Sequence, residues 1–100
     1  MFIEENSDCT VLGVKGPIRL GEAVGWLELS QRAWDRKLPI EIDLGEAEHM
    51  HAAAWQVLFA LQRSCEEHAL RFQIRAMSSV AEAGYLLLGL GSEHATAEAP

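Results

Sequence analysis

The amino-acid sequence predicts an α/β fold, built on a mixed, mainly parallel sheet of four to five strands whose helices lie mostly on one face. Residues 39–44 and 70–75 alternate apolar and polar side chains, which is the period of a β-strand. Residues 21–37 and 51–68 instead carry apolar side chains at helical spacing. Strands that alternate with helices favour parallel pairing through right-handed crossovers.

The N-terminal part of the chain predicts a short hairpin followed by a helix. A first strand is expected around Phe2–Glu4, and Asn6–Asp8 has the composition of a turn. A second strand is expected over Cys9–Lys15, because Gly16–Pro17 is a pair that commonly ends a strand. The helix over residues 21–37 then has cationic side chains in its last two turns, where the helix dipole favours them.

The alternation in residues 39–44 indicates a sheet that is covered on one side. The side chains at 40, 42 and 44 are apolar and share one face, while Glu41 and Asp43 share the other. Parallel sheets that are buried on both faces read as continuous apolar runs, so we expect the second face to be partly wet. If the strands are neighbours, Arg71 and Arg75 lie opposite these carboxylates, and each pair contributes roughly 0.2–1 kcal/mol.

Each predicted helix has one apolar face. In residues 21–37 this face is expected to consist of Ala23, Val24, Leu27 and Trp34, with Trp26 at its edge. In residues 51–68 it consists of Ala54, Leu58, Leu61 and Cys65, widened by Trp55 and Val57. The last helix is expected to start at the capping-box match Ser79-x-x-Glu82 and to end before Gly91, or earlier at Gly89. Its expected apolar face is Val80, Ala83, Leu87 and Leu90.

Length and charge limit the classes of function. One hundred residues predict a single domain, which we place at residues 1–91, with a flexible tail over 92–100. Eight basic against fifteen acidic side chains give a net charge of −7, which argues against a nucleic-acid surface. No apolar run reaches the roughly 18 residues of a membrane span, so we expect a cytoplasmic protein that does not cross the membrane. Cys9 and Cys65 are both expected to be reduced, buried thiols.

The segment GEAEHMHAAAW, residues 45–55, is the most unusual in the chain. It joins a predicted strand to a predicted helix, which is where sites lie in open α/β sheets. A metal site would use His49, His51 and a neighbouring carboxylate, but the spacing fixes no third ligand. Trp55 is either a core residue, as most helical aromatics are, or an exposed anchor for a partner.

No motif of an enzyme is present. The chain has no G-x-S-x-G, no G-x-G-x-x-G and no phosphate-binding loop, and no nucleophile has a recognisable base. We therefore expect no catalytic residue, no cofactor and no resident metal.

Several short motifs, taken in order, resemble the STAS domain, the family of the anti-sigma-factor antagonists and of the accessory STAS subunit of bacterial lipid-transport ABC systems. They are Lys15-Gly16-Pro17-Ile18, Ile40-Glu41-Ile42-Asp43-Leu44, Met77-Ser78-Ser79-Val80 and Gly89-Leu90. The resemblance covers about Cys9 to Leu90. It implies a STAS-like fold and a non-enzymatic, regulatory protein-binding function.

The family's Asp-Ser-Ser-Gly motif, at the start of its second long helix, is altered in this chain. The corresponding residues are His51-Ala52-Ala53-Ala54. In partner-switching members the first serine accepts a phosphate from a partner kinase, and that serine corresponds to Ala52, which has no hydroxyl. The resemblance therefore implies a docking surface that is not phosphorylated at this position.

The resemblance also implies a protein partner: a histidine-kinase-like ATPase acting as an anti-sigma factor, a signalling array protein, or an ABC ATPase subunit. We predict that the partner contacts the turn at the start of the second long helix. The predicted contact residues are Glu48, His49, Met50, His51, Ala52, Ala53, Ala54 and Trp55. The alternatives are an accessory subunit of a lipid-transport ABC system, a small metal-binding protein that uses His49 and His51, and a homodimer formed through the open face of the sheet.

Overall fold

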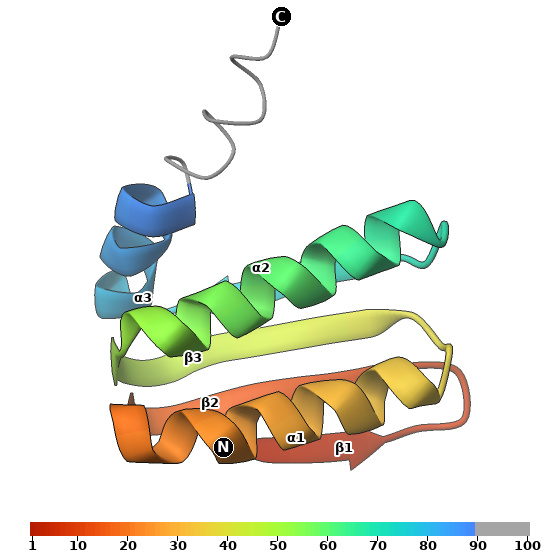
Figure 1. Ribbon diagram of the computed structural model, residues 1–100, viewed down its shortest axis with the longest axis horizontal. Helices are drawn as coiled ribbons and strands as arrows, with labels where there is room; N and C mark the ends of the chain where they lie inside the picture. Colours follow the sequence, from red (N-terminus) through yellow and green to blue (C-terminus); the bar gives the residue numbers. More distant parts are fainter. Residues whose placement is uncertain (90–100) are drawn as a thin grey trace, which may run out of the picture.

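The computed structural model describes residues 1–89 and shows a four-stranded sheet with helices on one of its faces (Figure 1). Its strands are β1 (Phe2–Glu5), β2 (Thr10–Ile18), β3 (Ile40–Met50) and β4 (Phe72–Met77). Its helices are the short 3-10 turn η1 (Leu20–Glu22), α1 (Ala23–Asp35), α2 (Ala52–Glu67), α3 (Ser79–Gly84) and the π-helical turn η2 (Tyr85–Gly89). The tail expected at 92–100, and the expected end of the last helix before Gly91, lie outside the described residues.

The strand order in the sheet is β1-β2-β3-β4, with β1 antiparallel to β2 and the other two pairs parallel. The hairpin between β1 and β2 is closed by the N–H of Asn6, which donates to the carbonyl of Cys9 at 3.0 Å. The two crossover helices, α1 and α2, run side by side in the same direction over one face of the sheet (Figure 1). The predicted α/β class, with a mixed and mainly parallel sheet, is confirmed.

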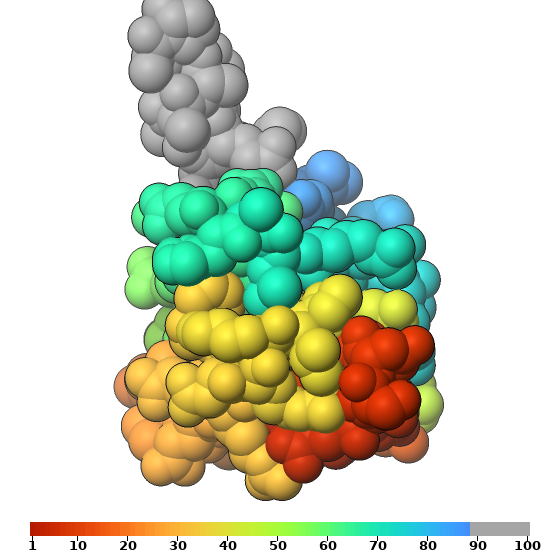
Figure 2. All heavy atoms as spheres, turned by 90° about the vertical axis from the view of Figure 1, so that its right-hand side faces the viewer, coloured from red at the N-terminus to blue at the C-terminus, as the bar shows by residue number. Residues whose placement is uncertain are grey.

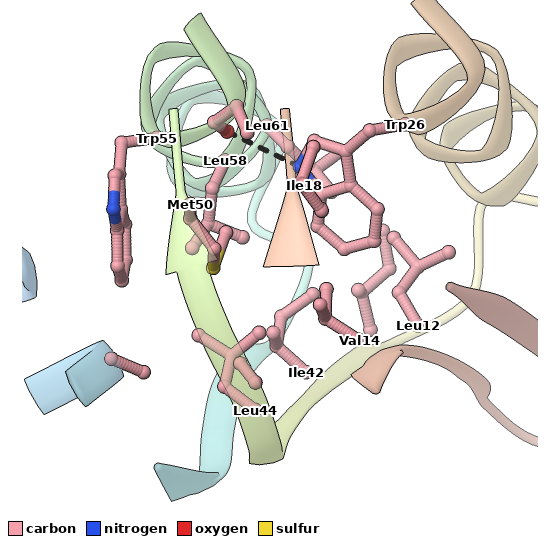
Figure 3. Packing of buried hydrophobic residues seen from close by; sticks show 14 of the residues in the cluster. Leu12, Val14, Ile18, Trp26, Ile42, Leu44, Met50, Trp55, Leu58 and Leu61 are labelled. Atoms are coloured by element: carbon pink, nitrogen blue, oxygen red, sulfur yellow. Dashed lines mark hydrogen bonds between the residues drawn. The ribbon is translucent and has the colours of Figure 1, made fainter. Parts of the chain in front are cut away.

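The core lies between the sheet and the helices (Figure 3). Ile40, Ile42 and Leu44 point into it from β3, as their alternation predicts. Leu12 and Val14 do the same from β2. Burial of these branched side chains is the main stabilising contribution, since each contributes roughly 1.5–3 kcal/mol relative to full exposure.

The opposite face of the sheet carries the expected charges. The guanidinium of Arg75 on β4 pairs with the carboxylates of Glu41, at 3.3 Å, and Asp43, at 3.2 Å, on the neighbouring strand. Arg71 is exposed and forms no ion pair within residues 1–89, contrary to expectation. Further along this face the ring of Phe2 covers Gly13, where any side chain would collide with it.

Strand β2 continues past Gly16–Pro17, where the sequence predicted its end. Gly16 adopts a φ of +80°, and the register with β3 shifts on either side of it, which marks bulges rather than a stop. Proline is tolerated at position 17 because β1 pairs with β2 only as far as Gly13. Beyond that point β2 is an edge strand, and the missing N–H of Pro17 faces no neighbour on that side.

Strand β3 also runs further than predicted, because residues 45–50 form strand and not loop. The bulges change the spacing of the buried positions, from every second residue up to Leu44 to every third residue at Ala47 and Met50. The alternation that identifies a strand is therefore absent from this part of the sequence. β4 in turn begins at Phe72, two residues later than predicted.

Helix α1 buries a different face from the one predicted. Its buried residues are Ala23, Trp26, Ser30 and Ala33. Trp26 is 0% exposed, whereas Val24 and Leu27 are 63% and 41% exposed and Trp34 is half-buried. The expectation is confirmed for Ala23 and wrong for Val24, Leu27 and Trp34, because the helix is oriented to bury the whole Trp26 ring, which removes a large apolar area from water.

The last helix also presents a different face to the core. Ala81 is buried, while Val80 and Leu87, expected in the core, are 52% and 78% exposed, and Ala83 is exposed as well. Leu90 lies outside the described residues. Within residues 1–89, none of the helices combines the length and the apolar character needed to cross a bilayer.

The end of the molecule where α1 and α2 finish is closed by turns that lie against one another (Figure 2). Arg36, at the end of α1, donates to the carbonyls of Asn6, at 2.6 Å, and Cys9, at 3.1 Å, and to the hydroxyl of Thr10, at 2.8 Å. One side chain thus ties the β1–β2 turn to the helix layer. The opposite end of the sheet, where β3 ends and α2 begins, holds the residues predicted to bind a partner.

We predict that Asp43 makes stability depend on pH. The N–H of Gly45 donates to its carboxylate at 3.0 Å, and this bond and Arg75 hold the pKa of Asp43 below its ordinary value of 3.8. A carboxyl whose pKa is lowered on folding stabilises the fold above its unfolded-state pKa, and the contribution is lost as the pH falls through the folded-state pKa. Asp43→Asn should therefore lower the free energy of unfolding at neutral pH, and the difference from wild type should shrink below pH 3.8.

Urea unfolding at about pH 7 and about pH 3 measures this difference. Asp8→Asn, the same change at an exposed position in the β1–β2 turn, is measured beside it as the matched control. An equal difference between Asp43→Asn and wild type at both pH values would contradict the assignment.

Candidate functional site

The candidate site lies where β3 ends and α2 begins, at the carboxyl edge of the parallel strands. The sequence predicted a loop here, whereas the structure continues the strand to Met50 and leaves one connecting residue, His51. In β3 the side chains of Ala47 and Met50 turn into the core. Glu46, Glu48 and His49 are exposed, so this edge presents them to solvent.

His51 is the N-cap of α2. Its Nδ1 accepts a hydrogen bond from the N–H of Ala53 at 3.0 Å, and its backbone N–H donates to the carbonyl of Ile18 at 2.8 Å. The first bond satisfies one of the N–H groups that every helix start leaves free, and the second ties that start to the end of β2. His51 thus has a structural role, and its ring occupies the place where an anion would meet the helix end.

The first turn of α2 divides into an outer and an inner half. Ala52 is exposed and Ala53 is half-buried, whereas Ala54 and Trp55 are buried. Of the eight predicted contact residues, Met50, Ala54 and Trp55 therefore belong to the core and are not available to a partner. The possibility that Trp55 is an exposed anchor was wrong.

Trp55 is buried because α3 covers it (Figure 3). Its ring stacks on Phe59, with ring centroids 5.8 Å apart, and lies 6.3 Å from the ring of Tyr85. A Cβ atom on Gly84 would lie 3.0 Å from the Trp55 ring, so glycine allows this close approach. No local pattern around Trp55 predicts this packing, because its neighbour in space lies 29 positions later in the chain.

Ser78 connects α3 to the same strand end. Its hydroxyl donates to the carbonyl of Ala47 at 2.6 Å and accepts from the N–H of Ala81 at 3.1 Å. The sequence predicted Ser79 as the start of a capping box, and the structure moves the cap by one residue to Ser78. Two adjacent serines offer equivalent caps, and the bond to β3 selects the first.

Trp26 connects α1 to the first turn of α2. Its indole Nε1–H donates to the carbonyl of Ala54 at 3.2 Å inside the core (Figure 3). This residue, expected at the edge of the apolar stripe, sets the position of α2 beside α1. The site is therefore held from three sides, by β2 through His51, by α1 through Trp26 and by α3 through Ser78.

The described residues bring together no evident metal donor set. Within residues 1–89, no three His, Cys, Asp or Glu side chains are grouped so that they could hold a metal ion. The Nδ1 atom of His51 already accepts the N–H of Ala53 in the cap. This nitrogen is therefore not available to bind a metal ion together with His49. Cys9 and Cys65 are both free, and burial raises the pKa of the Cys65 thiol, which disfavours the reactive thiolate.

Comparisons with known proteins agree with the fold alone. No family model matches the chain, and no curated protein matches it. Among solved structures, the chain is similar to one described as "Crystal Structure Analysis of Mglu", with a TM-score of 0.65 and 16% sequence identity. The similarity covers 79% of this chain and 20% of that chain, so this chain spans a fifth of the length of its structural neighbour. At this identity the likeness supports the α/β architecture and carries no function.

We predict that His51 contributes to stability through its cap. His51→Ala should lower the free energy of unfolding by about 1 kcal/mol, the usual contribution of an N-cap side chain. His51→Asp should restore it, because aspartate is a good cap and its charge suits the helix N-terminus. Urea denaturation at neutral pH measures both variants, and equal stability of His51→Ala and wild type would show that the cap contributes nothing.

Proposed function

We propose that this protein is a non-enzymatic regulatory module that binds another protein, in the manner of a STAS domain. The observation that carries the proposal is the exposed surface at the start of α2, which we call the α2 docking surface. It consists of the exposed residues Glu48, His49 and Ala52 and the half-buried residues His51 and Ala53. The resemblance of the sequence to the STAS domain points to the same place.

The shape and rigidity of the α2 docking surface suit protein binding. Its centre is the exposed methyl group of Ala52, and small side chains allow a partner's backbone to approach closely. The cap of His51 and the Trp26–Ala54 bond fix the turn before any partner arrives. A preformed surface loses less conformational entropy on binding than a mobile one.

The same residues favour binding over catalysis. Ala52 has no hydroxyl, and the ring of His51 already accepts the N–H of Ala53, so positions 51 and 52 offer neither a nucleophile nor a free Nδ1 base. Cys65, which is buried and has a raised pKa, is no better placed. We therefore propose that the module acts by occupying its partner, without phosphorylation at position 52.

The proposed partner is a cytoplasmic protein of one of three classes: a histidine-kinase-like ATPase, a signalling array protein, or an ABC ATPase subunit. The last would make this chain an accessory subunit of a lipid-transport system. The three classes make the same prediction about the α2 docking surface, and identification of the bound protein separates them.

Ala52→Glu tests the α2 docking surface. A glutamate in the first turn of a helix interacts favourably with the dipole, so this change should leave the fold intact while placing a charge in the interface. Tagged wild-type and variant proteins are incubated with native cell extract, and bound proteins are identified by mass spectrometry. We expect a partner of one of the three classes with the wild type and its loss with Ala52→Glu.

Ala76→Glu is the matched control, because it introduces the same charge at an exposed position of β4 on the other face of the sheet. It should retain the partner. Loss with Ala76→Glu but not with Ala52→Glu would move the interface to the open sheet face, and retention by both variants would also contradict the proposed surface.

A further inference from the structure

An apolar groove runs between the two long helices, on the side of the helix layer that faces away from the sheet. Its volume is about 640 Å³. Apolar residues of η1 and of both long helices line it, and the main ones are Leu20, Val24, Leu27, Val57, Ala60 and Leu61. We call this feature the α1–α2 groove.

The apolar rim of the α1–α2 groove is more exposed than the fold requires. Leu20, in η1, and Val24, in α1, are each 63% exposed, and Leu27, one turn further along α1, is 41% exposed. Contiguous exposed apolar side chains of this kind mark interaction sites on soluble domains. Two neighbouring helices with an apolar trough between them are suited to a third helix.

The hydroxyl of Ser30 is a buried polar group beside the α1–α2 groove. Ser30 lines the groove and is 3% exposed, and its hydroxyl has no hydrogen-bond partner within residues 1–89. A buried hydroxyl without a partner is destabilising, and native structures contain few of them.

Charge indicates which kind of chain fits. Glu28 and Asp35 follow the groove residues Val24 and Gln31 by four positions each, and Glu67 follows Ala60 by seven, so the three carboxylates border the groove on both helices. None of them forms an ion pair in the described part of the chain.

Two cations lie nearby. Arg63 is exposed next to the groove, and Lys37 is placed over the ring of Trp34 at 3.8 Å. The carboxylates at the border, Glu28, Asp35 and Glu67, outnumber these two cations, which favours a basic occupant. The net charge of −7 on the chain opposes a second copy of it.

We propose that the α1–α2 groove binds an amphipathic helix of a partner protein, with leucine-like residues on one face and Lys or Arg along its flanks. The apolar face would cover Leu20, Val24 and Leu27, and the basic flanks would meet Glu28, Asp35 and Glu67. This second interface goes beyond the α2 docking surface, and the two adjoin at Ala53, which belongs to both.

A synthetic helical peptide tests the groove directly. The probe is a labelled peptide of about five turns, with leucine at positions i, i+3, i+4 and i+7 and lysine elsewhere. Its binding to the intact protein is measured by fluorescence anisotropy, and the bound surface is mapped by amide chemical-shift changes in NMR. We expect saturable binding with shifts concentrated on α1 and α2 along the groove.

Val24→Lys should weaken binding of this peptide by about tenfold or more, because it places a cation in the apolar trough. The variant should fold, since Val24 is largely exposed. Leu87→Lys is the matched control, an equally drastic change at an exposed leucine of η2 outside the groove, and it should bind as wild type does. A peptide of the same composition in scrambled order should bind more weakly than the amphipathic one.

Three results would overturn the proposal: no binding of the amphipathic peptide, equal binding by wild type and Val24→Lys, or equal binding of the scrambled peptide. Self-association of the wild type in sedimentation, abolished by Val24→Lys, would also overturn it and assign the groove to a second copy. These outcomes are independent of the α2 docking surface, because Ala52→Glu leaves the tested rim unchanged.

Discussion

The buried indole of Trp26 sets the arrangement of the helix layer. It lies between α1, the sheet and α2, and its Nε1–H donates to the carbonyl of Ala54. Because Ala54 is in the first turn of α2, this bond fixes the start of that helix relative to α1. The end of β3, joined to α2 through the single residue His51, is fixed with it.

The burial of Trp26 also exposes apolar side chains of α1 on the side of the helix layer that faces away from the sheet. An α-helix turns by 100° per residue, so orienting Trp26 toward the sheet carries Val24 and Leu27 around to the outside. The side chains that could have formed an alternative core stripe become the rim of the α1–α2 groove. The groove and the α2 docking surface are thus both consequences of how α1 is rotated.

The regular parts of the fold could be predicted because each follows from a local pattern. Alternation identified the strand around Ile42 and the ion pairs that Arg75, though not Arg71, forms on its outer face. The residue that caps α2 was placed at the helix start. Residues 45–50 were not predicted as strand because the bulges beside Gly16 place the buried side chains of β3 at every third residue instead of every second. A change of register is a property of two strands, and one strand's sequence does not contain it.

The errors on the helices have a different cause. In α1, two overlapping stripes satisfy the helical period, one with Val24 and Leu27 and one with Trp26, Ser30 and Ala33. Periodicity alone does not choose between them, and the choice depends on the fit of Trp26 against Ala54. The burial of Trp55 likewise depends on the approach of Gly84 from α3, which is a tertiary contact.

Hydrogen exchange measures whether Trp26 holds the first turn of α2 in place. Trp26→Phe keeps most of the apolar volume and removes the donor to Ala54. If the account is right, the amides of residues 54–58 exchange faster in the variant, by a larger factor than core amides such as those of Leu12 and Ile42, which report the global change in stability. Equal acceleration at all of these amides, or none at the start of α2, would contradict it.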